Sequence, residues 1–355
     1  MIAEVAFNLP LERTFHYLIP LDAEAMLQPG MRVAAPFGPR ERIGFVLRRV
    51  AKSPIRELKS IRRVLDPVPV IAEERWALAS WMSEYYYCSL GEALAAMVPG
   101  DLRLARAWAA TAASQKDQAV SAAEPEDGGG ALALSPSQQR AFQTILQGLN
   151  VPQGPARTVL LHGVTGSGKT ELYLQAIDRV LQQGRSAICL IPEIALTPQT
   201  IDRFRARFGE RVAVWHSRLT AAQRSSAWCR MMRGECPIVV GARSAVFSPV
   251  PRLGLVILDE EHEATYKQED TPRYHTREVA CARAGLTGGV VILGSATPSV
   301  ESYYAASRDP RWLVTLPERV KGRTLPTVEV VDMRKHLAAR HRAGPFSDRL
   351  RAALQ

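Results

Sequence analysis

The sequence lacks the features that mark membrane and secreted proteins. Its apolar runs are short, Leu255–Leu258 being typical, whereas a membrane-spanning helix needs about 18 consecutive apolar residues. The N-terminus has no basic segment followed by an apolar one, so we expect no secretory signal peptide. The five cysteines are scattered without a Cys-x-x-Cys pair, which argues against a disulfide framework or a four-thiolate zinc site within these residues. We therefore expect a cytoplasmic protein with no membrane partner.

Acidic residues are fewer than basic residues in this sequence. Among 355 residues, 45 are Lys or Arg and 35 are Asp or Glu, which gives a formal net charge of +10. This excess favours a polyanionic partner, although a solvated Arg-rich surface would produce the same count. The hydrophobic share of 46% is that of a globular protein, and the length predicts two to three domains.

The first hundred residues contain short alternating runs, including Arg32–Ala35 and Ile43–Val50, separated by Pro and Gly. This pattern predicts a small β-rich unit. A helix is expected from Glu73 to Tyr87, and we interpret its aromatic residues as core packing. These aromatic residues are Trp76, Trp81, Tyr85, Tyr86 and Tyr87.

From Leu134 onward, apolar runs alternate with segments long enough for helices, such as Glu171–Gln183 and Ala221–Arg233. Continuous apolar strands separated by helices predict a parallel sheet covered on both faces, and hence an α/β fold. The predicted strands are Val159–Leu161, Ala187–Ile191, Val212–Trp215, Ile238–Val240, Leu255–Leu258 and Val290–Leu293.

A phosphate-binding pattern, G-x-x-x-x-G-K-[ST], lies between a predicted strand and a predicted helix. Its glycines allow backbone N–H groups to cradle phosphate oxygens at the positive end of the following helix. In such loops the lysine, here Lys169, reaches the β and γ phosphates, and the hydroxyl of Thr170 ligates Mg²⁺. The expected nucleotide-binding residues are Gly163, Val164, Thr165, Gly166, Ser167, Gly168, Lys169 and Thr170.

Carboxylates follow the apolar run that ends at Leu258, in the order Asp259-Glu260-Glu261-His262. The carboxyl end of a parallel strand is where α/β sheets place their ligand crevice. Asp259 is expected to hold Mg²⁺, and Glu260 to orient and deprotonate an attacking water. Alone, the run could be a solvated acidic helix start. Together with Lys169 it indicates an NTPase, and its DEAH-box-like pattern favours a helicase-type motor.

These blocks and their order resemble superfamily 2 helicases, and within them the PriA (primosomal protein N′) family of replication-restart helicases. Leu160–Tyr173 matches the family's phosphate loop beyond the generic pattern. The resemblance implies that Gln138 reads adenine. Pro192–Gln199 and Gly241–Ala245 resemble the blocks that contact the backbone of single-stranded DNA, which implies roles for Thr197, Arg243 and Ser244.

The resemblance also implies residues that couple DNA binding to nucleotide state. They come from the Asp-Glu-x-His block, from the family's aromatic-rich loop that follows it, and from the block Gly294–Pro298. They are His262, Tyr266, Lys267, Arg273, Tyr274, Ser295 and Thr297.

Arg13–Tyr17 and Pro36–Gly38 resemble the family's N-terminal domain, which captures a 3′ DNA end. The family usually has an acidic residue at the position of His16. Phe15 and Tyr17 are candidates for stacking on a base, with core packing as an equal alternative. The implied DNA-contacting residues are Phe15, His16, Tyr17, Gly38 and Lys59.

Four segments follow from this resemblance. Residues 1–104 form a β-rich domain that binds a 3′ DNA end, 105–133 an Ala- and Gly-rich linker, 134–318 a RecA-like ATP-binding lobe, and 319–355 a connector toward a second lobe. The linker is too short for the family's winged-helix domain. The arginine finger and the zinc-binding cysteines of the second lobe are expected to lie outside these residues.

The resemblance implies an ATP- and Mg²⁺-dependent 3′ to 5′ DNA helicase that recognises stalled forks and initiates primosome assembly; Zn²⁺ is expected only for full-length members. The implied partners are forked and single-stranded DNA, replication-restart proteins and the single-strand DNA-binding protein. Two alternatives stay open: a catalytically incomplete DNA- and nucleotide-binding fragment or adaptor, and a double-strand DNA translocase.

Overall fold

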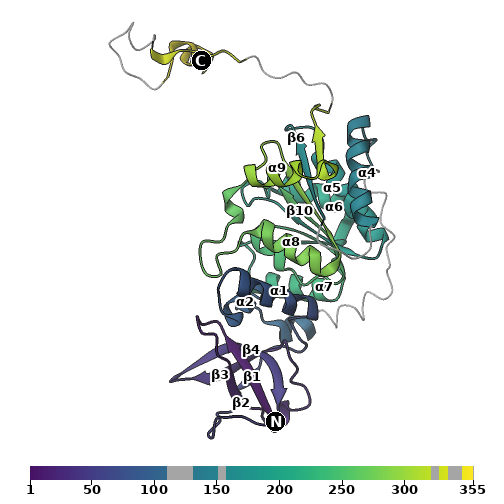
Figure 1. Cartoon of the computed structure of the whole chain (residues 1–355). Coiled ribbons are helices and arrows are strands. Elements are labelled where there is room, and N and C mark those ends of the chain that lie inside the picture. Colours follow the sequence, from purple (N-terminus) through teal and green to yellow (C-terminus); the bar gives the residue numbers. More distant parts are fainter. Residues whose placement is uncertain (110–130, 151–156, 321–327, 335–345, 355) are drawn as a thin grey trace. The chain divides into compact units, whose positions relative to one another are not determined.

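The computed structural model describes residues 1–109, 131–150, 157–320, 328–334 and 346–354 (Figure 1). Two compact units are present, Met1–Glu318 and Arg319–Gln355. The second contains α11 (Asp348–Leu354), and the first contains both sheets. Of the expected linker 105–133, residues 110–130 lie outside the described part, and residues 104–109 are helical.

Within Met1–Glu318, we call the first hundred residues the N-terminal unit and the α/β part that follows from Leu134 the lobe. The N-terminal unit is built on a five-stranded antiparallel sheet in the order β2-β1-β4-β3-β5. The predicted alternating runs lie within its strands, because one face of the sheet packs on a small apolar core around Val5, Leu27 and Val33. The strands are β1 (Ile2–Phe7), β2 (Phe15–Leu18), β3 (Arg32–Phe37), β4 (Arg40–Val50) and β5 (Arg63–Val64).

Two helices follow this sheet, α1 (Glu73–Tyr85) and α2 (Leu90–Met97). Ser89 and Glu92 form a capping box that starts α2, which satisfies two backbone N–H groups at its first turn. Gly91 brings α2 against β1: a Cβ at this position would lie 1.8 Å from the carbonyl oxygen of Phe7. Only glycine permits this close approach of two backbones.

The second sheet has seven parallel strands in the order β12-β6-β11-β10-β7-β9-β8. It confirms the expected α/β class, with β11 between the strand of the phosphate loop, β6, and the acidic strand, β10. The predicted strands are all present. Their bounds are β6 (Arg157–Gly163), β7 (Ser186–Leu190), β8 (Val212–Trp215), β9 (Ile238–Gly241), β10 (Leu253–Asp259), β11 (Val290–Ser295) and β12 (Leu313–Leu316).

Helices cover both faces of this sheet (Figure 1). Alternate residues of β10 show why the runs are continuously apolar: Ile257 packs toward α4 and α5, and Leu258 packs into the core on the opposite side. The helices are α4 (Pro136–Asn150), α5 (Lys169–Gln182) and α6 (Pro198–Phe208) on one side, and α7 (Ala221–Met232), α8 (Thr276–Thr287) and α9 (Val300–Ser307) on the other.

Helix α1 packs against α8 and shares an apolar core with it through Leu78 and Met82. Within this contact Arg283, whose side chain is fully buried, donates to Glu74 at 2.6 Å and to the carbonyl oxygen of Val246 at 2.5 Å. A buried guanidinium needs such partners because desolvation of its charge is costly. The N-terminal unit is therefore joined to the α/β lobe by packing and by a partly buried ion pair.

We expected all the aromatic residues of the predicted helix Glu73–Tyr87 to be core residues, and this is wrong for two of them. Tyr85 is 54% exposed and stacks on Trp81 with ring centroids 4.9 Å apart, and Tyr87 is 97% exposed. The helix ends at Tyr85, so helical periodicity does not predict which way the side chains of the next residues point. Tyr86 is half-buried and turns toward the lobe.

The Gly91→Ala variant is expected to lower stability by about 1–3 kcal/mol, because the added methyl collides with backbone that cannot move aside. Urea unfolding followed by tryptophan fluorescence measures this change. Gly100→Ala is the matched control, since its Cβ meets nothing within 4 Å. Equal unfolding midpoints for the two variants would contradict the close approach of α2 to β1.

Candidate nucleotide and DNA sites

The phosphate loop turns between β6 and α5 on two glycines in the left-handed region, Gly166 (φ +81°) and Gly168 (φ +84°). Gly168 is the N-cap of α5, so the first N–H groups of that helix are not used within it. Val164, Thr165 and Gly166 are exposed, and Thr170 is half-buried in the first turn. The geometry is that of an anion cradle.

Two polar groups of the loop indicate an anionic ligand. The buried Ser167 Oγ has no hydrogen-bond partner among the described residues, and buried polar atoms normally have one. Lys169 Nζ donates to the carbonyl oxygen of Gly163 at 2.7 Å and lies 4.0 Å from Glu260 Oε1. The loop thus holds donors that phosphate oxygens could satisfy, and the residues present fit a nucleotide.

Gln138 lies against this loop at the start of α4. Its Nε2 donates to the carbonyl oxygen of Ser167 at 2.8 Å, and its Oε1 accepts from the N–H of Ser135 at 2.9 Å. The side chain is buried. It therefore fixes the position of the phosphate loop from the helix that precedes β6, whether or not it also contacts a base.

The acidic strand delivers Asp259 beside α5. Tyr173, one turn after Lys169, donates from its hydroxyl to Asp259 Oδ1 at 2.9 Å. Burial raises the pKa of Asp259, and the hydrogen bond from Tyr173 opposes this shift. A cation near Asp259 would favour the ionised form. With the hydroxyl of Thr170, this carboxylate is the candidate Mg²⁺ site, which needs few protein ligands because phosphates and water supply the others.

Glu260 adopts a left-handed backbone conformation (φ +45°), which costs of order 1–3 kcal/mol and occurs most often at functional sites. Its neighbours hold it there. Asp259 ends β10, and the N–H of Glu261 donates to the carbonyl oxygen of Gly294 at 3.1 Å. The Glu260 carboxylate faces Lys169 on one side and lies 3.7 Å from His262 Nδ1 on the other.

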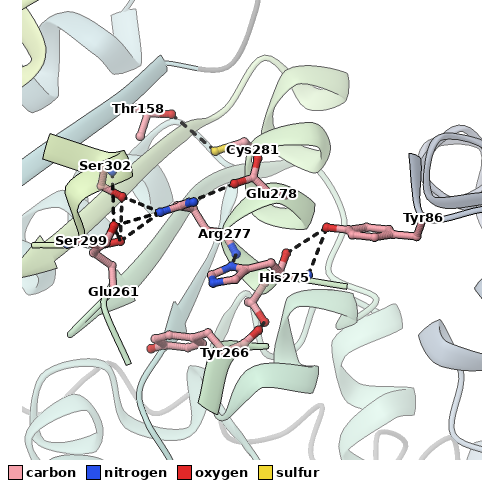
Figure 2. A network of polar contacts seen from close by, with 11 residues as sticks. Tyr86, Thr158, Glu261, Tyr266, His275, Arg277, Glu278, Cys281, Ser299 and Ser302 are labelled. Carbon is pink, nitrogen blue, oxygen red and sulfur yellow. Dashed lines mark hydrogen bonds and ion pairs between the residues drawn. The ribbon is translucent and has the colours of Figure 1, made fainter. Parts of the chain in front are cut away.

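Glu261 was not assigned a role from the sequence, yet it is the most buried of the three carboxylates (1% exposed). It accepts from the N–H of Ser299 at 2.7 Å and from Ser302 Oγ at 2.7 Å, and Arg277 lies 3.6 Å away (Figure 2). Arg277 also donates to both serine hydroxyls. This cluster ties the acidic block to the start of α9.

A second link between these two blocks is made by His262, whose Nδ1 lies 2.8 Å from Ser295 Oγ. The same hydroxyl accepts from the N–H of Thr297 at 2.9 Å. These three expected coupling residues are thus brought together by direct hydrogen bonds.

The expected DNA-contacting and coupling segments of the lobe meet at a cleft of about 510 Å³. Arg243 and Ser244 line it, and Nη1 of Arg243 donates to the carbonyl oxygens of Thr265 and Lys267 at 3.2 and 2.6 Å. Thr197 is not among the lining residues. It is exposed and caps α6, accepting from the N–H of Thr200.

The loop 264–275 forms one wall of this cleft. The hydroxyl of Tyr266 donates to the carbonyl oxygen of Asp259 at 2.7 Å, which joins the cleft to the acidic strand. Lys267 donates to the carbonyl oxygen of Arg273, and the buried ring of Tyr274 packs edge-on against Phe247. The four expected coupling residues of this loop therefore lie in one connected structure.

The N-terminal candidates gather on the small antiparallel sheet. Phe15 packs edge-on against Phe37 with centroids 5.2 Å apart. His16 Nδ1 lies 2.8 Å from Ser53 Oγ. Lys59 is exposed beside β2, where its carbonyl oxygen accepts from the N–H of Leu18.

Gly38 lies in the exposed turn between β3 and β4. Tyr17 is different from the other candidates, since its ring is buried and its hydroxyl donates to the carbonyl oxygen of Pro36 at 2.9 Å. Core packing, one of the two alternatives left open for Tyr17, is the one observed.

Two protein families match successive parts of this chain. A model of the PriA 3′ DNA-binding domain matches residues 4–99, and a model of DEAD/DEAH box helicases matches residues 135–306. The chain belongs to the PriA family. The two matched regions of this PriA family member are the small antiparallel sheet with its two helices and the α/β lobe.

Relatives of the PriA family match nearly the whole chain. The replication restart protein PriA of Treponema pallidum is 40% identical over 340 residues, which cover 94% of this chain and 49% of the relative. Those of Bacillus subtilis and Haemophilus influenzae are each 33% identical, over 92% and 100% of this chain and 56% and 57% of the relatives. The chain thus spans about half the length of these curated relatives.

The described residues contain neither a membrane-spanning helix nor a metal-binding cluster. No helix there has the length and apolar character needed to cross a membrane, and no group of three or more His, Cys, Asp or Glu side chains could hold a metal ion.

Gln138→Ala is expected to weaken nucleotide affinity about tenfold, because the buried carbonyl of Ser167 loses its donor at a cost of about 1–3 kcal/mol. Titration with a fluorescent ADP analogue and Mg²⁺ measures this. Gln139→Ala, at the exposed neighbour, is the control. An unchanged affinity for Gln138→Ala would show that this side chain does not shape the loop.

Proposed function

We propose that this chain carries the 3′-end-binding unit and the first motor lobe of an ATP- and Mg²⁺-dependent DNA helicase of replication restart. One observation carries the proposal: Tyr266 lines the cleft with Arg243 and Ser244, and its hydroxyl donates to the backbone carbonyl oxygen of Asp259. A single side chain thus touches both sites that a translocating motor must couple.

The roles of the site residues follow from their positions. The loop Gly163–Thr170 would hold the phosphates, with Lys169 on the β and γ groups and Thr170 and Asp259 on Mg²⁺. Glu260, near Lys169, would orient and deprotonate the attacking water. Gln138 would read adenine from its place beside the loop.

Single-stranded DNA would be gripped through its phosphates by Arg243, Ser244 and Thr197, without sequence preference. The N-terminal sheet would receive the recessed 3′ end through Phe15, His16, Gly38 and Lys59, while Tyr17 supports it from the core. The proposal includes 3′ to 5′ polarity, recognition of stalled forks and initiation of primosome assembly.

Partners and location belong to the same proposal. The proposed partners are forked and single-stranded DNA, other replication-restart proteins and the single-strand DNA-binding protein. The relatives' name, replication restart protein, supports a role in that process. We propose a cytoplasmic location, where cysteines are usually reduced; all five cysteines of this chain are free.

Steady-state ATP hydrolysis with and without forked DNA, at low and at physiological salt, tests the proposal. Fork-stimulated turnover supports it. Binding of nucleotide and DNA without turnover supports the fragment or adaptor instead, since an arginine finger contributes about 10³–10⁵ to such rates. Equal affinity for blunt duplex and for a fork with a recessed 3′ end supports a double-strand translocase.

Lys169→Ala is expected to lower ATP turnover by roughly 100-fold or more, because it removes a preorganised donor from the phosphate site. Fork affinity should stay within about twofold, a factor too small to reflect loss of a contact. Lys52→Ala, at an exposed lysine of the N-terminal unit, is the control for turnover. Loss of fork binding in a folded Lys169→Ala protein would contradict this division of roles.

A further inference from the structure

Tyr86 connects the N-terminal unit to the loop 264–275 of the lobe. It follows α1 directly, and its hydroxyl accepts from the N–H of His275 at 3.1 Å and lies 3.5 Å from the carbonyl oxygen of the same residue (Figure 2). Burial raises the pKa of Tyr86 to about 12. The hydroxyl therefore stays protonated at physiological pH and is able both to accept and to donate.

The ring of Tyr86 contacts the same loop at a second point. Lys267 Nζ lies 5.8 Å from the ring centroid, within the range of a cation–π contact. Lys267 lines the cleft, and its carbonyl oxygen accepts from Arg243. Tyr86 thus contacts the cleft wall at Lys267 and the end of the loop at His275.

From each of these two contact points, a series of neighbouring contacts continues to the candidate nucleotide site. Lys267 adjoins Tyr266, whose hydroxyl bonds to the carbonyl oxygen of Asp259. On the other branch, Nδ1 of His275 accepts from the N–H of Arg277, and Arg277 lies against the buried Glu261 (Figure 2). The two routes end on either side of Glu260.

Helix α1 is a firm support for this contact. It shares an apolar core with α8 and is held by the partly buried ion pair between Glu74 and Arg283. Tyr86, at its end, is therefore a fixed point for a loop that otherwise borders the cleft.

We infer that Tyr86 is a positioning residue: it anchors the loop 264–275 to the N-terminal unit so that DNA in the cleft changes the affinity of the nucleotide site. This inference rests on the proposed function. It assigns to the N-terminal unit, through one hydroxyl, a part in coupling that is separate from capture of a DNA end.

The test is the coupling between the two ligands. The dissociation constant of a fluorescent, non-hydrolysable ATP analogue with Mg²⁺ is measured with and without a saturating single-stranded oligonucleotide. The dissociation constant of the oligonucleotide is measured with and without the analogue. The two ratios must agree because coupling is reciprocal, and typical values are about 5–150-fold.

Tyr86→Phe removes only the hydroxyl and is expected to bring this ratio to within about twofold of one. The affinity for the analogue alone should stay unchanged, and the melting temperature should fall by only a few degrees because one partly buried N–H loses its acceptor. Tyr85→Phe is the matched control. It removes the exposed hydroxyl of the neighbouring tyrosine and keeps the stack on Trp81, so the wild-type ratio should persist.

The outcomes separate the inference from the proposed function. A wild-type ratio in Tyr86→Phe, or a loss of analogue affinity and melting temperature together, overturns the inference alone. Wild-type protein that binds both ligands without coupling also overturns it. Wild-type protein that binds no analogue at all contradicts the proposed function.

Discussion

The hydrogen bond from Tyr173 to Asp259 is the interaction on which the nucleotide site depends. It joins the helix of the phosphate loop to the acidic strand, although β11 lies between β6 and β10 in the sheet. The crossing is possible because Gly294 on β11 has no side chain. A Cβ there would lie 1.7 Å from the Tyr173 hydroxyl oxygen. The phosphate loop and the Asp259 carboxylate thus meet at the same edge of the sheet. This depends on the strand order, on the missing side chain at Gly294 and on the hydroxyl of Tyr173.

The conformation of Glu260 depends on the structure around that bond. Its strained backbone lies between Asp259, tied to Tyr173 and Tyr266, and Glu261, buried against Ser299, Ser302 and Arg277. A strained residue persists only where its neighbours over-determine it. The buried Glu261 cluster therefore supports the conformation of Glu260, and it is continuous with the segment that carries Ser295 and Thr297.

The sequence predicts what is local. The strands of the parallel sheet are read from apolar runs, and the phosphate loop and Asp259 from short spacings. The two-residue strand β5 gives no pattern to read. Contacts such as Tyr86 with His275, 189 residues apart, and Glu74 with Arg283, 209 apart, have no signal in a single sequence. A role for Tyr173 could have been predicted from the sequence, because it lies four residues after Lys169 and therefore on the same face of the helix.

The apolar core shared by α1, α2 and the lobe has a consequence for synthesis of the chain. Leu78, Met82 and Leu94 emerge from the ribosome long before their partners Val279 and Ala284 of α8. At elongation rates of about 5–20 residues per second the interval is on the order of 10–40 s. During this time the small sheet carries an unpartnered apolar helix face. A nascent N-terminal unit of this kind is a natural client for chaperones that bind exposed apolar segments, and its folding is complete only once the lobe has formed.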